Sequence, residues 1–295
     1  MPSPEHEALV AMLASAPPIA APTVAEQRAN YDAMMAAQTI PADVRVESFS
    51  IGGNDADFVT IDGQAGTGVT ILYLHGGGYV IGSNVGYREF GGRLSRATGA
   101  RVCVLNYRLA PENPYPAAVD DAVAAYRYLR AQGVPAGKLV IAGDSAGGGL
   151  TLATLMALRD AGDALPACAV TFSPWTDLAG TGATMAPGLV DDPLVSGEGV
   201  GVMAAAYGGA RLQDPLVSPL YGNYGGLPPL LIQVGTREVL LDDSRRAAAK
   251  ARDAGVPVTY FEGEGLIHVW PVLAVNAPES AAALDQVASF IHANA

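Results

Sequence analysis

The chain has 295 residues, and 17 Lys and Arg against 29 Asp and Glu give it a formal net charge of −12 at pH 7. Half of its residues are hydrophobic and 16% are charged, which excludes an intrinsically disordered chain. The acidic balance argues against nucleic acid or an anionic membrane as a partner, because phosphate binding needs clustered Lys and Arg. One dense basic run, made of Arg245, Arg246, Lys250 and Arg252, is predicted to be the solvated face of one helix.

The N-terminal region and the cysteines indicate the cellular compartment. Residues 8–25 carry no charge, but prolines at positions 17, 18 and 22 interrupt them, and two glutamates flank His6 just before them. A signal peptide would have basic residues there. Cys103 and Cys168 lie in apolar, strand-like runs, which favours buried free thiols in a reducing compartment over a disulfide. We therefore expect a soluble, cytoplasmic protein.

From about residue 58 the chain alternates short β-branched runs with helical patterns, which predicts an α/β fold with a mainly parallel sheet. Several of the runs are apolar throughout, as expected for strands covered on both faces. The predicted strands are Phe58–Ile61, Val69–Leu74, Arg101–Leu105, Lys138–Ala142, Ala167–Phe172, Leu230–Val234 and Val258–Glu262. The predicted helices are a repeat from Val119 to Leu129, Ser145–Leu158, Asp242–Ala254 and Glu279–His292.

Two regions do not fit this alternation. Residues 1–40 indicate two Ala-rich helices split by Pro17–Thr23, and residues 177–226 hold many Gly and Pro but little strand pattern. Such segments are candidates for a helical cap over a site at the strand ends. No linker separates them from the rest, so we expect one domain over residues 1–295.

The strongest local signal is G-D-S-A-G at residues 143–147, where an apolar strand runs into an Ala/Leu helix. The glycines permit a tight strand-to-helix turn, which would hold Ser145 at the edge of the sheet as a nucleophile. The helix N-terminus would point backbone N–H groups at the same place. The alternative is a Gly-rich turn or phosphate loop.

A second motif, H-G-G-G at residues 75–78, follows another predicted strand. Glycines let the backbone approach a substrate oxygen closely, and their N–H groups can donate to it. His75 is expected to anchor this loop and not to transfer protons. The alternative is a flexible loop after an edge strand.

A serine nucleophile needs a base, and the chain has four histidines. His6 lies in a predicted surface helix and His292 is three residues from the C-terminus, so both are expected to be exposed to solvent and not functional. His268 follows the last predicted strand, which makes it the candidate base, with a structural histidine as the alternative.

The acid is expected between the penultimate strand and His268. Glu238 is the first carboxylate after the strand Leu230–Val234. Asp242 and Asp243 come later and are typical of helix-start residues, although either could be the acid instead.

With H-G-G-G, G-D-S-A-G and a late histidine in this order, the sequence resembles the hormone-sensitive-lipase-like esterases, the bacterial family IV carboxylesterases of the α/β-hydrolase fold. Segments 106–112, 116–121, 173–175 and 218–229 also look like family signatures, and the resemblance covers roughly residues 45–292. It implies that the N–H groups of Gly77, Gly78 and Ala146 bind the oxyanion, with His75, Gly76 and Asp144 supporting the two motifs. It also implies that the N-terminal helices belong to the cap.

One departure concerns the acid. The family usually has Asp in G-x-x-D-x-L, and this chain has Glu238 at that position. The segments around Glu238 and His268 look most similar to the branch that contains the monoterpene ε-lactone hydrolases.

The sequence thus predicts a serine hydrolase of short- to medium-chain esters that works through an acyl-enzyme, without cofactor or metal. A lactone hydrolase with the same triad is one alternative. A non-catalytic receptor on the same fold, similar to the plant gibberellin receptor, is another, although His268 argues against it. The expected partner is a small-molecule ester or lactone. The oligomeric state stays open and is compatible with a homodimer.

Overall fold

An eight-stranded sheet forms the centre of the molecule in this computed structural model, which describes residues 1–15 and 23–295. The strand order is β1-β2-β4-β3-β5-β6-β7-β8. β1 and β2 are antiparallel to each other, β2 is antiparallel to β4, and all other neighbours are parallel. The predicted α/β fold with a mainly parallel sheet is confirmed.

Each predicted strand is present, with ends shifted by a few residues. The strands are β1 (Val44–Ile51), β2 (Asn54–Ile61), β3 (Thr70–Leu74), β4 (Arg101–Leu105), β5 (Leu139–Asp144), β6 (Cys168–Phe172), β7 (Leu230–Gly235) and β8 (Val258–Gly263). β3, β5, β6 and β7 are buried along their whole length, as their apolar runs predict. Cys103 in β4 and Cys168 in β6 are buried free thiols.

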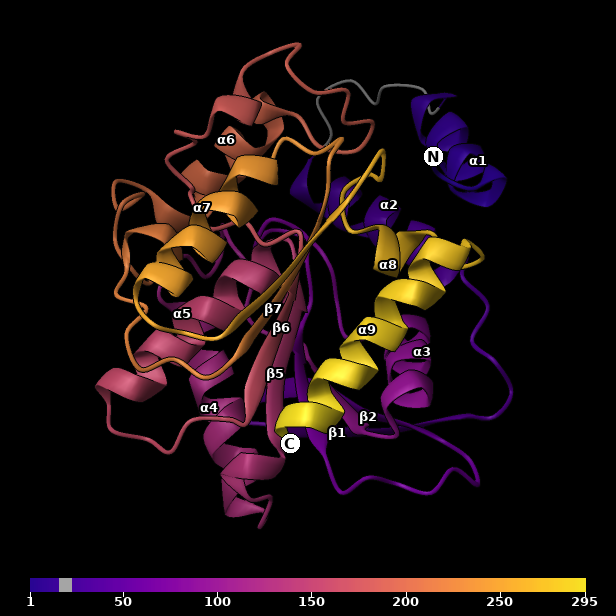
Figure 1. Ribbon diagram of the computed structural model, residues 1–295, viewed down its shortest axis with the longest axis vertical. Coiled ribbons are helices and arrows are strands. Elements are labelled where there is room, and N and C mark those ends of the chain that lie inside the picture. Colours follow the sequence, from indigo (N-terminus) through magenta and orange to yellow (C-terminus); the bar gives the residue numbers. More distant parts are fainter. Residues whose placement is uncertain (16–22) are drawn as a thin grey trace.

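Helices cover both faces of the sheet (Figure 1). Successive side chains of a strand point to opposite faces, so Leu72 of β3 packs in the layer that holds α4, α5 and α7, and Tyr73 packs in the layer with α3 and α9. The helices of the first layer are α4 (Ala117–Ala131), α5 (Ala146–Asp160) and α7 (Leu241–Asp253), and those of the second are α3 (Arg88–Thr98), α8 (Trp270–Leu273) and α9 (Pro278–Asn294).

The hairpin at the edge of the sheet differs from the prediction. β1 is an additional strand, and β2 begins four residues before the predicted Phe58. Gly52 and Gly53, both with positive φ, form the two-residue turn between them. Two glycines between alternating runs are a hairpin signal. The acidic residues Asp55 and Asp57 interrupt the apolar pattern at the start of β2 and hide the strand.

Helix α3 was also not predicted, because it carries few large apolar residues. Its sequence signals are the i, i+4 pair Glu89–Arg93 and Gly99, which ends the helix with φ 67°.

The helices α1 (Pro4–Ser15), α2 (Val24–Ala36) and α6 (Gly197–Gly208) lie towards the upper end of the molecule, opposite the C-terminus, with α1 and α6 on different sides (Figure 1). α1 and α2 match the two predicted N-terminal helices. Most of the predicted break between them, residues 16–22, lies outside the described residues. Among the helices that the structure describes, none is long and apolar enough to span a membrane.

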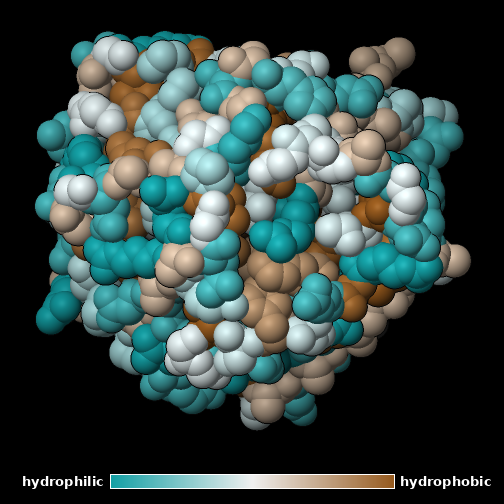
Figure 2. Space-filling model, turned by 90° about the horizontal axis from the view of Figure 1, so that it is seen from below, coloured by the Kyte–Doolittle hydropathy of each residue, from teal (hydrophilic) through white to brown (hydrophobic). Residues whose placement is uncertain are grey.

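The face at the lower end, seen in Figure 2, is covered largely by hydrophilic residues with small hydrophobic groups between them. Tyr31 of α2 and three residues of α6, in contrast, line a cavity next to Ser145. In α/β folds, ligands bind at the carboxyl ends of the parallel strands, so a functional site is expected at this end of the sheet.

Candidate active site

Ser145 lies at the turn between β5 and α5, where the sequence predicts a nucleophile. Its backbone has φ 52° and ψ −120°, a conformation that non-glycine residues rarely adopt. The turn is held by hydrogen bonds from the Ser145 N–H to Phe172 O (2.8 Å) and from the Trp175 N–H to Ser145 O (2.9 Å). A strained strand-to-helix turn that exposes a serine is the geometry of a nucleophile elbow.

The glycines of the G-x-S-x-G motif are required by close packing. A Cβ atom on Gly147 would lie 1.9 Å from the carbonyl oxygen of Leu74, and one on Gly143 would lie 2.3 Å from that of Gly147. Helix α5 therefore begins in contact with the end of β3. A larger residue at either position would push the elbow away from the sheet.

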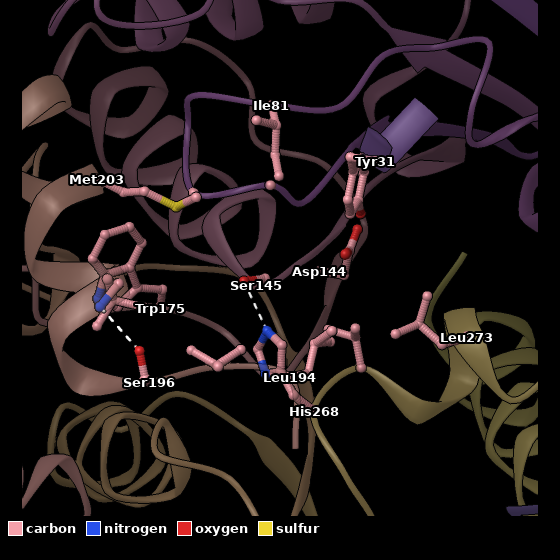
Figure 3. Close-up of a pocket in the computed structure, with 16 residues that line it drawn as sticks. Tyr31, Ile81, Asp144, Ser145, Trp175, Leu194, Ser196, Met203, His268 and Leu273 are labelled. Atoms are coloured by element: carbon pink, nitrogen blue, oxygen red, sulfur yellow. Dashed lines mark hydrogen bonds between the residues drawn. The ribbon is translucent and has the colours of Figure 1, made fainter. Parts of the chain in front are cut away.

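His268 reaches Ser145 from the loop after β8. Its Nε2 atom lies 2.9 Å from Ser145 Oγ, as the dashed line in Figure 3 marks. His268 is almost completely buried, as is Glu238. The structure thus brings the predicted nucleophile and base into hydrogen-bond contact.

Glu238 completes the contact chain from the other side of the imidazole. Its Oε2 lies 2.8 Å from His268 Nδ1, and its Oε1 accepts hydrogen bonds from the Gly235 N–H (2.5 Å) and the Ser173 hydroxyl (2.7 Å). The longer Glu side chain therefore reaches the imidazole where the family usually has Asp. With both oxygens used, the carboxylate is fixed in one orientation.

The charge of Glu238 decides the protonation of His268. Burial lowers the pKa of His268, whereas the Glu238 carboxylate and its hydrogen bond raise it. The net result is a pKa above the ordinary value of 6.5. An imidazole with this pKa is a stronger base than a free histidine.

Asp144 joins the serine turn to the H-G-G-G loop. Its buried carboxylate accepts hydrogen bonds from the Tyr73 hydroxyl (2.7 Å), the Gly76 N–H (2.9 Å) and the Tyr87 hydroxyl (2.8 Å). Burial raises the pKa of Asp144 to about 6, against these hydrogen bonds, which lower it. The sequence does not reveal the two tyrosines as its partners, because they come from β3 and the loop before α3.

His75 is oriented within the loop and away from the reacting groups. Its Nδ1 lies 2.7 Å from Gly76 O, and its ring stacks on Tyr107 with 4.2 Å between ring centroids. Complete burial lowers the pKa of His75 to about 4, so the ring is neutral at pH 7 and Nδ1 donates to the carbonyl. This geometry fits the expected anchoring role.

The three residues that the family resemblance implies as oxyanion donors lie close to Ser145. Gly77 and Gly78, with φ of 111° and 59°, line the same cavity as Ser145 and His268, and Ala146 is the first residue of α5. None of these N–H groups has a hydrogen-bond partner among the residues that the structure describes. Free donors beside a nucleophile can bind a developing oxyanion.

The cavity over Ser145 has a volume of about 220 Å³, more than the ~150 Å³ cavity that binds benzene in an engineered protein. Tyr31 of α2 and residues of the 177–226 region form part of its wall, as shown around Ser145 and His268 in Figure 3. The cavity-lining side chains that the sequence did not single out are mainly apolar: Ile81, Leu194, Val195, Val200, Met203, Val269 and Leu273.

Two predictions near the site hold for position but miss contacts that the structure shows. Asp242 and Asp243 are in the first turn of α7, but Asp243 is not a simple helix-start residue. It is fully buried, and its Oδ2 accepts the N–H groups of Thr176 (2.7 Å) and Asp177 (2.8 Å). The basic run on α7 is also not merely solvated, because Arg246 pairs with Asp177 and Lys250 donates to Leu220 O.

The expectation for His6 is wrong. It is fully buried, since α1 packs on the loop that carries His268, whereas His292 is exposed as expected. Periodicity identified the helix but could not show which surface it covers.

Comparison with known proteins assigns the family. The alpha/beta hydrolase fold family matches residues 71–272. A crystal structure of an esterase from the bacterial hormone-sensitive lipase family is 41% identical, covers 100% of this chain and 99% of its own, and superposes with a TM-score of 0.94. The chain belongs to the hormone-sensitive-lipase-like esterases. It is a carboxylic ester hydrolase of the α/β-hydrolase fold.

Relatives of this esterase agree with the assignment. An acetyl-hydrolase of Streptomyces hygroscopicus is 48% identical over 225 residues, which are 76% of this chain and 75% of the relative. An esterase of Acinetobacter venetianus is 35% identical over 232 residues, 78% of this chain and 77% of that protein. In the described part of the esterase, no group of three or more His, Cys, Asp or Glu side chains is placed to hold a metal ion.

Proposed function

We propose that Ser145, His268 and Glu238 are the catalytic triad of this esterase and that it cleaves short- to medium-chain esters through an acyl-enzyme. One observation carries the proposal. A continuous hydrogen-bond chain runs from Ser145 Oγ through both ring nitrogens of His268 to Glu238 Oε2. This is the arrangement in which a base activates a serine and a carboxylate fixes the base.

In the first step Ser145 Oγ attacks the ester carbonyl carbon, and its proton passes to His268 Nε2. Glu238 holds the imidazole with its Nδ1 proton towards the carboxylate and stabilises the imidazolium. The carbonyl oxygen becomes an anion that the N–H groups of Gly77, Gly78 and Ala146 stabilise. His268 then protonates the leaving alcohol, and the acyl group stays on Ser145.

In the second step water replaces the alcohol. His268 takes a proton from the water, the hydroxide attacks the acyl carbon, and the tetrahedral anion returns to the same donors. Collapse releases the carboxylic acid and restores the Ser145 hydroxyl. The proton that His268 took from the water returns to Ser145 Oγ, so the two steps balance with one ester and one water consumed.

The size and lining of the cavity support short substrates. About 220 Å³ bordered by apolar side chains suits a small acyl or alcohol group. Tyr31, Leu194 and Met203 belong to segments that we propose as the cap. A relative named an acetyl-hydrolase is consistent with a small acyl group.

The test is hydrolysis of p-nitrophenyl acetate and butyrate before and after treatment with diisopropyl fluorophosphate. We expect turnover that the reagent abolishes, with the phosphoryl group found by peptide mass spectrometry on Ser145. A label on another residue would contradict the assignment of the nucleophile. Hydrolysis of six- and seven-membered lactones, followed by the acid released in a pH-stat, tests the lactone alternative. The cytoplasmic location and a homodimer stay predictions.

A further inference from the structure

The N-terminal helix α1 is bound to the loop that carries His268. Val10 of α1 packs against Leu266, Ile267 and Trp270, with Leu9 and Leu13 at the margin. A Cβ atom on Gly265 would lie 2.8 Å from the ring of Pro2, so the start of the chain is in close contact with the start of this loop. The N-terminus and the candidate base are therefore parts of one packed unit.

His6 makes the polar contact within this unit. It is fully buried, and its Nε2 accepts the N–H of Ile267 over 3.2 Å. Ile267 directly precedes His268 in the chain. A buried backbone N–H without a partner is costly, so this acceptor defines the position of the Ile267 peptide.

A second side chain holds the residue on the other side of His268. The Val269 N–H donates to Ser173 Oγ over 3.0 Å, and the same hydroxyl donates to Glu238. The peptides that flank His268 are thus fixed by two side chains from distant parts of the sequence, one from α1 and one from the loop after β6. A base must be held within a fraction of an ångström of its productive position.

We propose that His6 is a positioning residue for catalysis, whose neutral imidazole accepts the Ile267 N–H and thereby fixes the backbone that carries His268. The inference rests on the proposed role of His268 as the base. It assigns to α1 a function that is separate from covering the cavity, because no residue of α1 lines that cavity.

The surroundings of His6 agree with a neutral ring. Burial lowers its pKa below 6.5, Glu7 and Glu279 raise it, and Arg237 lowers it further. With Nε2 as the acceptor, the ring proton is on Nδ1, which is 3.9 Å from a Glu7 carboxylate oxygen. A proton on Nε2 would place two donors face to face and release Ile267.

Two matched variants separate this role from simple packing. In His6→Gln the side-chain oxygen can reach the position of Nε2, whereas in His6→Asn it is too short to do so. We expect His6→Asn to lower kcat about tenfold and His6→Gln to stay within about threefold of the wild type, both with unchanged KM. We also expect the acid limb of kcat/KM to move to lower pH in His6→Asn, since a displaced imidazole loses part of its contact with Glu238.

Ser15→Ala is the control. Ser15 is the exposed last residue of α1, and its hydroxyl donates to Met12 O of the same helix over 2.9 Å. We expect its kcat to stay within about twofold of the wild type. Equal losses in Ser15→Ala and His6→Asn, or no rescue by Gln, would overturn the proposal.

Amide hydrogen exchange gives a readout that does not depend on the variants. The Ile267 amide should exchange slowly in the wild type and in His6→Gln, and fast in folded His6→Asn. Fast exchange in the wild type would overturn the proposal even if His6→Asn failed to fold. The two proposals can fail separately. If the proposed triad is wrong, Ser145→Ala remains active. If only the role of His6 is wrong, Ser145→Ala is inactive and folded His6→Asn is fully active.

Discussion

The hydroxyl of Ser173 joins the carboxylate of Glu238 to the backbone of Val269, next to His268. It donates to Glu238 Oε1 over 2.7 Å and accepts from the Val269 N–H over 3.0 Å. Ser173 itself has φ 48°, a conformation that non-glycine residues rarely adopt. The acid and the base are therefore fixed by a common group and not by their mutual hydrogen bond alone.

This arrangement makes Glu238 sensitive to loss of charge. In Glu238→Gln, an amide nitrogen that faces His268 Nδ1 favours the tautomer with its proton on Nε2, which cannot accept the Ser145 proton. An amide nitrogen that faces Gly235 instead places two donors face to face. We expect kcat to fall about 10³–10⁴-fold, or roughly 4–5.5 kcal/mol of transition-state stabilisation. Glu238→Asp keeps the charge and should retain much more activity. Both are measured with p-nitrophenyl butyrate.

Asp242→Asn is the control for this series, because Asp242 is in the same loop-to-helix junction but its polar partners are Thr184 and Arg245 and not His268. Its kcat should stay within about threefold of the wild type. A crippled Asp242→Asn together with a nearly normal Glu238→Gln would show that the acid is misassigned.

The order of the motifs made the candidate site predictable from the sequence. The sequence shows a strand before G-x-S-x-G, a helix after it, and a histidine after the last strand. In a parallel sheet the carboxyl ends of these strands lie at the same edge, so the serine and the histidine come close together. Glu238 was predictable as the first carboxylate after β7. Ser173 was not, because its function depends on contacts 65 and 96 positions away.

Burial and tertiary pairing account for the differences from the predictions. His6 and Asp243 have the residue types of exposed helix ends, and only the packed structure shows that they accept backbone N–H groups from other segments. β1 and β2 were obscured because polar residues alternate with apolar ones in an edge hairpin. Central strands lack this ambiguity, since both faces are covered and the apolar run is continuous.

The raised pKa of His268 predicts the acid side of the pH profile. The base must be neutral to accept the Ser145 proton, so activity is lost as pH falls through the pKa of His268. Because Glu238 raises this pKa above 6.5, half-loss of kcat/KM should occur above pH 6.5. In Glu238→Gln the limb should move to lower pH. A wild-type limb well below pH 6.5 would contradict the described balance of burial and charge.

Asp243 predicts a pH-dependent difference in stability. Burial raises its pKa to about 7, so the folded state favours the neutral carboxyl, and the stabilisation present below its ordinary pKa is lost as pH rises through 7. Asp243→Asn cannot ionise and keeps one oxygen for the N–H groups of Thr176 and Asp177. The difference in the free energy of unfolding between Asp243→Asn and the wild type should therefore shift in favour of Asp243→Asn by on the order of a few kcal/mol from pH 5 to pH 8.

Urea unfolding of Asp243→Asn at the two pH values measures this gain. Asp243→Ala removes the acceptor and should be less stable than the wild type at pH 5 by about 2–4 kcal/mol. If the wild type instead gains stability relative to Asp243→Asn between pH 5 and pH 8, Asp243 is not a buried neutral carboxyl group in the folded protein.

Met203 predicts chain-length specificity. A Cβ atom on Gly78 would lie only 2.0 Å from the Met203 sulfur. The Met203 side chain therefore packs directly on the H-G-G-G loop inside the cavity. Met203→Ala should raise kcat/KM for p-nitrophenyl octanoate relative to acetate about 3- to 10-fold. Val202→Ala is the control, since Val202 is on the same helix and 68% exposed. An equal change in both variants would show that Met203 does not limit the acyl group.

The central claim is that Ser145 is the nucleophile of this esterase, and the rate of Ser145→Ala tests it most directly. The substitution removes one oxygen from an elbow whose backbone is held by Phe172 and Trp175, so the variant should stay folded. We expect kcat on p-nitrophenyl butyrate to fall about 10⁴–10⁶-fold, with circular dichroism and thermal unfolding close to those of the wild type. A folded Ser145→Ala enzyme, free of wild-type contamination, that kept more than about a tenth of the wild-type rate would contradict the account.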